Sequence, residues 1–460
     1  MTFSSAKYGV APEDERADIK ILCDEYRKYN HIDPSAFERY GVKRGLRNAD
    51  GTGVMAGITN ICNVHGYVMD EGEKAPIDGE LIYRGINVEK LIDGCEKEDR
   101  YGFEEAVWLL LFGNLPTKTQ LTDFTTLLAQ MRELPDTFTE DMILKAPSPD
   151  IMNKLARSVL ALYSYDEDPD DCSLENVIRQ SVELVARMPT IMVSAYQVKR
   201  RFYDHKSMYF HPPKANHSIA QTILYTMRSD KTFTEEEAKL LDKCMILHAE
   251  HGGGNNSTFA TRVLTSSGTD TYSAIAAGIG SLKGPLHGGA NAKVMQMMES
   301  IKENVKDWKN DDELAAFLTK LVRKEAGDLS GKIYGMGHAV YTKSDPRATI
   351  LKANALKLAE NTEFIDEFKL IESVERLAPQ VLSAVKGEKK IICANVDLYS
   401  GMVYKMLRIP PELFTPLFAS SRIGGWCAHR VEELITGGRI IRPAYKAVSK
   451  DREYIPLEER

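Results

Sequence analysis

The chain has 460 residues, of which 43 % are hydrophobic and 27 % are charged, so it is long enough for two globular domains with a sizeable core. Its 66 acidic residues outnumber its 59 basic ones and give a formal net charge of −7, which argues against a nucleic-acid-binding surface because phosphate contacts need a basic face. No apolar run approaches the length of a membrane span, so no membrane association is predicted.

The first twenty residues are partly acidic and contain no apolar stretch, which fits neither a secretory signal nor an Arg-rich transit peptide. The seven cysteines are scattered without paired spacing, a pattern typical of reduced thiols rather than of disulfides or a zinc ribbon. These features predict a cytoplasmic protein.

Strand patterns are few and local. Residues 58–68 and 81–83 are predicted to form small hairpins near the N-terminus. The segment 103–112 has helical periodicity and is expected to end at Gly113. Residues 130–175 are rich in Asp and Pro, so they are expected to form exposed connections.

A longer helix is predicted to begin at Thr234, which can form a capping box with Glu237, and to end at the glycine triplet 252–254. Further helices are predicted at 311–326, 347–360 and 413–434, and a short strand at 439–442. Because strands and helices do not alternate, a doubly wound α/β fold is disfavoured and the architecture is predicted to be mainly α.

Two glycine-rich loops each present a histidine. His287 lies within 284–291, between a proline and a glycine pair, and His338 follows two glycines within 335–340. Glycine lets the backbone approach a ligand closely and adopt positive φ, a setting that a structural histidine rarely needs. The two imidazoles are therefore predicted to act as acid/base or hydrogen-bonding groups.

A third histidine, His251, lies three residues after His248, so a metal site on one helix face is one interpretation. No third ligand stands at a recognisable spacing and HExxH is absent, which disfavours it. The simplest alternative is that both histidines cap the last carbonyls of their helix. The small and polar run 252–258 favours a role for His251 beside an anionic ligand, because it offers backbone N–H groups.

Three arginines are candidates for anion binding. Arg347 would lie in the first turn of a helix capped by Asp345, where it either shares an anion with the exposed N–H groups or extends into solvent at a cost of ~0.3–1 kcal/mol. Arg422 lies in an apolar helix, so its charge needs a partner, which is either a bound carboxylate or an internal Asp or Glu. Arg442 precedes a proline, which keeps its backbone extended.

Asp397 follows the apolar run 391–394 and precedes a helical segment, 398–407. Its simplest role is that of the N-cap of this helix. The functional alternative is a carboxylate base at the mouth of a site, and the two roles can overlap.

From about residue 81 to residue 443, the sequence resembles citrate synthase and the 2-methylcitrate synthases of the same family. The matching motifs occur in order and are densest at 248–262, 269–291, 335–347 and 395–426, with a further family-like helix at 103–116. The resemblance implies an acyltransferase that condenses acetyl-CoA with oxaloacetate and hydrolyses citryl-CoA, at the entry of the tricarboxylic acid cycle. Acetyl-CoA would be a co-substrate, with no permanently bound cofactor or metal.

The resemblance also implies residue roles. His287 would hydrogen-bond the thioester carbonyl during enolisation, Asp397 would remove the methyl proton, and His338 would polarise the keto group of oxaloacetate. The dicarboxylate-binding set is matched by His251, Arg347, Arg422 and Arg442, and the adenine of coenzyme A would bind the loop around Gly335 and Gly337.

The implied subunit is mainly α and has two domains, a large one from 1–286 and 400–460 and a smaller mobile one from 287–399. Rotation of the small domain would then bring His287 and Asp397 together. In the family, the arginine that matches Arg442 reaches the active site from the partner subunit, which implies a homodimer.

The sequence departs from the common family pattern at three places, which leave the implied catalytic residues intact. A glycine triplet, 252–254, follows His251; Met336 stands where an aromatic residue is usual; and Tyr334 replaces a frequent proline. The role of the first 50 residues is left open.

Two other functions stay open. The nearer is 2-methylcitrate synthase using propionyl-CoA, because binding discriminates one extra methyl group only ~10–200-fold. The more distant is a non-catalytic acyl-CoA or dicarboxylate sensor, which would be expected to lack His287, His338 or Asp397, all three of which are present here.

Overall fold

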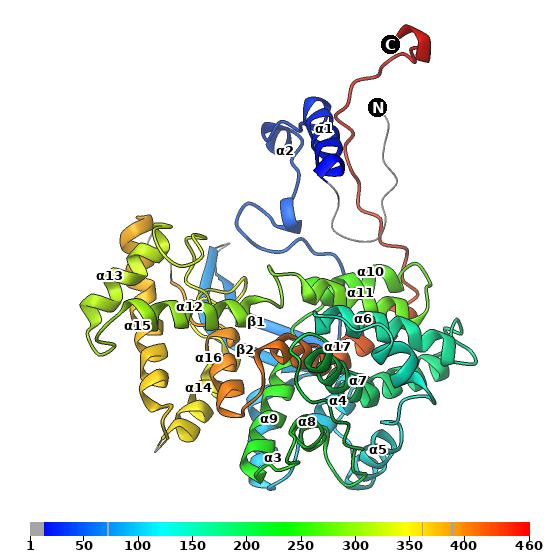
Figure 1. Ribbon diagram of the computed structural model, residues 1–460, viewed down its shortest axis with the longest axis vertical. Helices are drawn as coiled ribbons and strands as arrows, with labels where there is room; N and C mark the ends of the chain where they lie inside the picture. Colours follow the sequence, from blue (N-terminus) through cyan, green and yellow to red (C-terminus); the bar gives the residue numbers. More distant parts are fainter. Residues whose placement is uncertain (1–12, 71–72, 361, 388–390) are drawn as a thin grey trace. The chain divides into compact units, whose positions relative to one another are not determined.

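The computed structural model describes residues 13–70, 73–360, 362–387 and 391–460 (Figure 1). It divides into two units, which are described separately. The main unit is Gly57–Ile441, and the terminal unit combines the two chain ends, Met1–Ala56 and Arg442–Arg460. Within the described part of the chain, no helix combines the length and apolar character needed to cross a lipid bilayer.

The terminal unit contains short helices and extended chain. Its elements are α1 (Glu13–Tyr29), α2 (Ser35–Arg39) and the 3₁₀ helices η1 (Arg44–Leu46) and η5 (Leu457–Glu459). Large apolar side chains of this unit are exposed, including Tyr26, Tyr445 and Tyr454.

The main unit begins with an antiparallel hairpin of β1 (Cys62–Asp70) and β2 (Glu73–Tyr83), with Cys62 opposite Tyr83. The short β3 (Ile86–Asn87) pairs with the end of β2. The predicted strand segments form one hairpin, whose first strand begins at Cys62 rather than at residue 58. Its second strand is longer than 81–83 because it includes residues that lack an alternating apolar pattern. The register shifts at Gly66, between His65 and Tyr67.

The predicted strand at 439–442 is wrong. Residues 439–441 have no regular structure, and Arg442 belongs to the terminal unit. The backbone N–H of Ile441 donates to the Ser266 side chain at 3.0 Å rather than to a neighbouring strand. A single apolar pair after two glycines therefore does not form a strand here, since no partner strand supplies the ladder.

Most of the main unit is helical, as predicted. A first group of helices packs around α17 (Phe414–Ile435). This helix contacts α4, α7, α9, α10 and α11, and its Trp426 is fully buried. The helices of this α17 group are α3 (Val88–Lys97), α4 (Phe103–Phe112), α5 (Lys118–Gln130), α6 (Ile151–Leu162), α7 (Leu174–Phe202), α8 (Ile219–Met227), α9 (Glu235–His248), α10 (Asn256–Thr265) and α11 (Thr271–Lys283), with the short helices η2 (Thr139–Leu144) and η3 (Tyr163–Tyr165).

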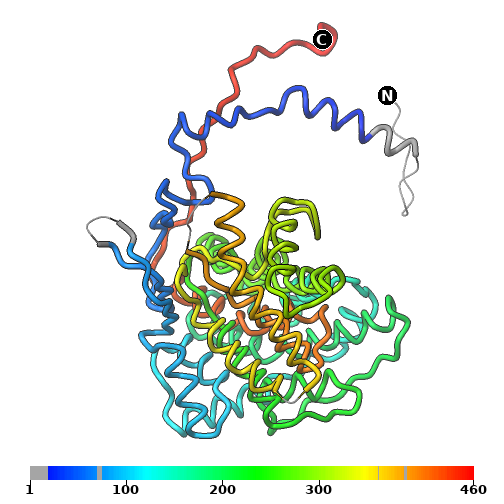
Figure 2. Tube along the Cα trace, turned by 90° about the vertical axis from the view of Figure 1, so that its left-hand side faces the viewer, coloured from blue at the N-terminus to red at the C-terminus, as the bar shows by residue number. Residues whose placement is uncertain are grey.

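A second group of helices packs together on one side of the main unit (Figure 1). It comprises α12 (Ala290–Asn304), α13 (Asp311–Val322), α14 (Pro346–Ala359), α15 (Ile365–Lys386) and α16 (Val396–Met406), and the short η4 (Pro411–Leu413) leads from it to α17. These helices face the viewer in Figure 2, in yellow-green to orange. The loops that carry His287 and His338 border this α12–α16 group.

Local sequence patterns set several helix ends as expected. Thr234 and Glu237 form both bonds of the predicted capping box at the start of α9. Gly113 ends α4 with a φ of 87°, which glycine adopts without strain. Asp345 caps α14, and Pro346 occupies its first turn. The helices predicted at 311–326, 347–360 and 413–434 correspond to α13, α14 and α17.

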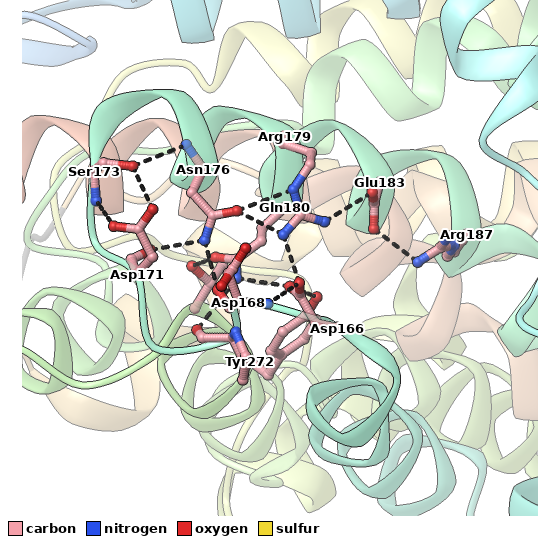
Figure 3. Close-up of polar contacts among 12 residues, drawn as sticks. Asp166, Asp168, Asp171, Ser173, Asn176, Arg179, Gln180, Glu183, Arg187 and Tyr272 are labelled. Atoms are coloured by element: carbon pink, nitrogen blue, oxygen red, sulfur yellow. Dashed lines mark hydrogen bonds and ion pairs between the residues drawn. The ribbon is translucent and has the colours of Figure 1, made fainter.

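The expectation of exposed connections at 130–175 is wrong in part, because this segment contains α6 and a buried carboxylate. Asp166 accepts hydrogen bonds from Arg179 at 2.6 Å, from Gln180 at 2.8 Å and from Tyr272 at 2.7 Å (Figure 3). These donors offset the cost of burying the charge. Asp166 thereby ties the segment to α7 and to α11, the helix that leads to His287.

Candidate active site of the main unit

The rings of three residues meet at the centre of the site. The imidazole of His251, just after α9, lies edge-on to that of His338, with centroids 5.0 Å apart. The ring of Tyr341 stacks on His338 at 4.7 Å and lies edge-on to His251 at 5.6 Å. Two histidines predicted separately from the sequence are thus neighbours, and Tyr341, on the same loop as His338, contacts both.

The position of the proton on His338 follows from its backbone partners. The N–H groups of Val340 and Tyr341 both donate to Nδ1 of His338, each at 3.1 Å. A nitrogen that accepts a hydrogen bond carries no proton, so the imidazole is neutral with its proton on Nε2. His338 can therefore donate one hydrogen bond from Nε2 to a carbonyl oxygen.

The His287 loop is held closely against α11. The N–H of Gly288 donates to the carbonyl of Leu282 at 3.0 Å, and a Cβ at residue 288 would lie 2.2 Å from that oxygen, so only glycine fits. Nε2 of His287 lies 3.1 Å from Oγ of Ser257, and Nε1 of Trp426 donates to the same oxygen at 3.1 Å. Burial, followed by the charge of Arg422, lowers the pKa of His287 to about 4, so this imidazole is neutral near pH 7.

Arg422 is a fully buried cation with unused donors. Its Nε donates to the carbonyl of His248 at 2.6 Å, and the ring of Phe418 lies 4.8 Å from its guanidinium carbon. Nη1 and Nη2 are buried without a hydrogen-bond partner in the described part of the chain. Because unpaired buried donors are costly, the two amino groups fit a carboxylate supplied by a ligand. Of the two partners considered for Arg422, an internal carboxylate makes no hydrogen bond to it.

Arg347 is buried, so the alternative in which it extends into solvent is wrong. Its Nε and Nη2 donate to the two oxygens of Asp345, at 3.0 and 2.7 Å. The same carboxylate accepts the backbone N–H of Arg347 as the helix cap. One internal carboxylate thus compensates both the cation and the positive helix end, and the Nη1 group of Arg347 is not used by this pair.

Asp397 is not the N-cap of α16, as its simplest interpretation required, because Asn395 has that place and accepts the N–H of Asp397 at 3.0 Å. Asp397 lies in the first turn instead. Burial raises its pKa to about 6, with a further contribution from Asp345 and with Arg347 and Arg422 opposing. A carboxylate with this pKa is ionised at neutral pH and is a stronger base than an ordinary aspartate.

The two histidines at the end of α9 do not cap its carbonyls. Both ring nitrogens of His248, and Nε2 of His251, are buried without a hydrogen-bond partner in the part of the chain that is described. The His248 ring packs on Phe418 with centroids 4.3 Å apart. Burial, with the charge of Arg347, holds the pKa of His251 well below its usual range, so it is a neutral group. The N–H of Gly252 is used internally, because it donates to Glu250 at 2.6 Å.

A buried polar chain behind Arg422 was not predicted from the sequence. Glu250 accepts from Nε2 of His429 at 3.0 Å, and Nδ1 of His429 accepts from Nε of Arg262 at 2.9 Å. Arg262 also pairs with Glu432 and Glu433. A histidine in the buried part of α17, His429, is the sequence signal that could have indicated this network. Burial lowers the pKa of Arg422, and the negative charge of Glu250 opposes this shift.

The glycine loop at 335–337 is joined to the chain that leads to Asp397. The N–H of Gly337 donates to Cys393 at 2.8 Å, and that of Asn395 donates to Gly335 at 2.8 Å. Gly335 has a φ of 81°, and a Cβ there would lie 2.8 Å from Cβ of Leu398, so glycine is required on both grounds. The glycine loop and the segment that leads to Asp397 are therefore joined by backbone hydrogen bonds.

This loop borders a cavity of about 620 Å³ that extends from the His287 loop to the ends of α12 and α15. Backbone and apolar groups of residues 331–338 form one wall, with Leu286 and Ile391 nearby. Three lysines also line it, Lys293, Lys332 and Lys386. The cavity suits an extended ligand that has both apolar and anionic parts.

Of the predicted residues, His251, His287, His338, Arg347, Arg422 and Asp397 belong to the main unit, and Gly335 and Gly337 line the cavity. Arg442 belongs to the terminal unit, so its participation stays a prediction. Among the described residues, no three His, Cys, Asp or Glu side chains gather so as to hold a metal ion. The main unit offers a carboxylate base, neutral imidazole donors and buried guanidinium groups, which suit proton abstraction and polarisation of carbonyls on anionic substrates.

Comparison with known proteins agrees with this chemistry. A family model described as "Citrate synthase, C-terminal domain" matches residues 48–444. The citrate synthase of Haloferax volcanii is 34 % identical over 411 residues, which cover 86 % of this chain and 98 % of that protein. The 2-methylcitrate synthase 1 of Corynebacterium glutamicum is 33 % identical over 428 residues, with 91 % and 98 % covered.

Solved structures give the same result. Citrate synthase from Pyrobaculum aerophilum superposes with a TM-score of 0.72 and 31 % identity, covering 88 % of this chain and 94 % of the other. Citrate synthase from Thermoplasma acidophilum, solved as a ternary complex with carboxymethyl coenzyme A and oxaloacetate, has a TM-score of 0.74 at 27 % identity, with 91 % and 99 % covered.

Proposed function

The chain belongs to the citrate synthase family, and we propose that its six main-unit residues named above, His251, His287, His338, Arg347, Asp397 and Arg422, condense acetyl-CoA with oxaloacetate. The citryl-CoA formed is then hydrolysed to citrate and CoA. The observation that carries the proposal is the pair of unpartnered amino groups on the buried Arg422, with neutral imidazoles and a carboxylate of raised pKa in the same site.

Proton removal from acetyl-CoA needs both a base and a donor. A thioester α-proton is far too weakly acidic for a carboxylate alone, so the developing enolate oxygen requires a preorganised donor. We assign Asp397 as the base and His287 as the donor, each contributing ~10²–10⁴-fold. Because Trp426 donates to Oγ of Ser257, that hydroxyl can donate its own proton to Nε2 of His287. Nδ1 of His287 then carries the imidazole proton toward the thioester oxygen.

Oxaloacetate has two carboxylates and a keto group. Nη1 and Nη2 of Arg422 would bind one carboxylate, and Nη1 of Arg347 with His251 would bind near it. Nε2–H of His338 would donate to the keto oxygen, which makes that carbon more electrophilic, and would then transfer its proton to the alkoxide formed there, which gives the new hydroxyl. The enol carbon attacks the polarised carbon, and water later cleaves the thioester.

The acyl-CoA fits the cavity beside the glycine loop. Backbone groups around Gly335 and Gly337 would hold the adenine, and the three lysines of the cavity would lie near the phosphates. We therefore propose that acetyl-CoA binds as a co-substrate and that no cofactor is bound permanently.

We also propose that a small domain at 287–399, which contains α12 to α15 and the first turn of α16, rotates against the remainder, 1–286 and 400–460, during each turnover. Its support is that His287 and Asp397 lie at the two ends of this segment, so a rotation would close both onto the substrate.

A homodimer in which Arg442 binds oxaloacetate in the partner's site is the assembly we propose. The exposed tyrosines of the terminal unit, which also contains Arg442, support an interface there. We propose a cytoplasmic location, which is supported by seven free cysteines.

A second candidate is 2-methylcitrate synthesis from propionyl-CoA, because relatives of both names match the chain with similar identity. Thiol release from acetyl-CoA and from propionyl-CoA, each with oxaloacetate, distinguishes the two on chelator-treated protein. Faster release from acetyl-CoA supports the proposal, and faster release from propionyl-CoA moves the protein to the methylcitrate reaction. Release from neither would favour the sensor alternative.

A further inference from the structure

Tyr341 contacts three residues of the site without belonging to the proposed catalytic set. Its ring stacks on His338 with an interplanar angle of 26° and lies edge-on to His251. The guanidinium carbon of Arg347 lies 5.9 Å from the centre of the same ring. One aromatic side chain therefore contacts the proposed keto-group donor and two members of the dicarboxylate-binding set.

The surroundings of Tyr341 differ from those of an ordinary core aromatic residue. The side chain is 1 % exposed, yet it is not a member of the hydrophobic core cluster of the main unit. Its neighbours on the site side are imidazole and guanidinium groups. Stacking between aromatic rings and between a ring and a cation depends on orientation, so these contacts favour one ring angle over others.

Both ends of Tyr341 are fixed. Its backbone N–H donates to Nδ1 of His338, and its hydroxyl donates to the carbonyl of Glu80 on β2 at 3.2 Å. The hydroxyl bond connects the site loop to the β1–β2 hairpin, which is 261 residues away in the sequence.

The hairpin lies unusually close to this loop. The N–H of Gly79 donates to Oγ of Ser344 at 3.0 Å. A Cβ at Gly79 would lie 2.2 Å from the carbonyl oxygen of Ser344, and one at Gly66 would lie 2.9 Å from that of Val340. Two glycines on facing strands thus allow the hairpin to contact the loop on both sides of Tyr341.

We propose that Tyr341 is a positioning residue for the condensation, held against the β1–β2 hairpin so that its ring sets the plane of the His338 imidazole. The proposal rests on the proposed function, because it assumes that Nε2–H of His338 donates to the keto oxygen of oxaloacetate. The ring carries this role, since the stacking contact is made by the ring, and the hydroxyl secures the ring to Glu80.

The test compares Tyr341→Leu, which removes the ring, with Tyr341→Phe, which removes only the hydroxyl. The first readout is the ¹³C chemical shift of the keto carbon in bound [2-¹³C]oxaloacetate, which reports polarisation by a hydrogen-bond donor and needs no turnover. Tyr272→Leu is the matched control, because Tyr272 is similarly buried but its hydroxyl donates to Asp166, which is not one of the proposed site residues (Figure 3).

We expect Tyr341→Leu to lose most of the shift that wild-type protein induces and to lower kcat by roughly 10–100-fold, the usual effect of a misplaced catalytic group. Its KM for oxaloacetate should change less, since Arg422 remains. Tyr341→Phe should keep the shift, and Tyr272→Leu should keep it with a lowered melting temperature.

A wild-type carbon shift and kcat in Tyr341→Leu would overturn the proposal, as would an equal loss of the shift in Tyr272→Leu. Failure of the proposed function has a different outcome, because wild-type protein would then neither shift the carbonyl signal nor release thiol.

Discussion

Asp345 and Arg347 form a two-bond ion pair inside the protein, two residues apart at the start of α14. The pair neutralises a cation that lies at the positive end of a helix, where it would otherwise be unfavourable. Asp345 also acts beyond its partner, because its negative charge contributes to the raised pKa of Asp397. A capping residue thus tunes the proposed base.

The pH dependence of activity should follow this arrangement. Asp397 must be ionised to accept a proton, and its pKa is about 6, so kcat/KM should fall as the pH drops through about 6. Asp345→Asn removes a charge that raises this pKa, so its acidic limb should move to lower pH. The measurement is a pH profile of thiol release for both proteins, and a limb that moves to higher pH would contradict the assignment.

Removal of the base should separate catalysis from binding. Asp397→Ala and Asp397→Asn are expected to lower kcat by ~10²–10⁴-fold while oxaloacetate still binds, as calorimetry can show. Turnover comparable to wild type in either variant would exclude Asp397 as the base.

The stability of the protein should also depend on Asp397. The pKa of its carboxyl is raised from 3.8 to about 6 in the folded protein, so wild-type stability should decline as the pH rises through that window. The Asp397→Asn variant should lack this decline in stability.

Arg422→Ala should weaken oxaloacetate binding by roughly 2–5 kcal/mol, the cost of removing one partner of a buried charge pair. Arg430→Ala is a matched control on the same helix, because Arg430 is equally buried but donates to Thr271 and to the carbonyl of Thr269. The control should lose thermal stability and keep its affinity. Wild-type affinity of Arg422→Ala in titration calorimetry would refute this assignment.

Closure of the proposed small domain should be visible in solution. Small-angle scattering with oxaloacetate and a non-reactive coenzyme A analogue is expected to give a smaller radius of gyration than scattering without them. Each ligand alone serves as a control for partial closure. An unchanged profile with both ligands would count against the rotation.

The placement of Arg442 in the partner's site can be tested by mixing two inactive variants. Asp397→Ala and Arg442→Ala each impair every site of their own homodimer. In a mixed dimer, one of the two sites combines an intact Asp397 with an intact Arg442, so equal mixing with subunit exchange should restore about a quarter of the sites. If Arg442 acts within its own subunit, mixing should restore none.

The features predicted correctly from the sequence are those that a short segment determines. The Thr234–Glu237 capping box and the Asp345–Pro346 helix start need only neighbouring residues, and each has the expected bonds. The glycine loops were recognised because positive φ and close approach require glycine at Gly335 and Gly288.

The remainder depends on residues that the fold brings together. His429 lies 179 residues from Glu250 and 167 from Arg262, so no periodicity connects them. The neutralisation of Arg347 was missed although its partner is close in sequence, because the pattern assigned Asp345 only to the helix cap, whereas its carboxylate accepts both the backbone N–H and the guanidinium of Arg347. Tyr341 was missed because an aromatic residue in a loop has no pattern of its own.

The unpartnered amino groups of Arg422 have a thermodynamic consequence. A dicarboxylate that supplies their acceptors binds the folded chain and not the unfolded one, and at a hundred times its dissociation constant it adds about 2.7 kcal/mol to the free energy of unfolding. Increments of this size change the steady-state fraction that proteases can degrade. The abundance of the protein in the cell would then follow the supply of its own substrate.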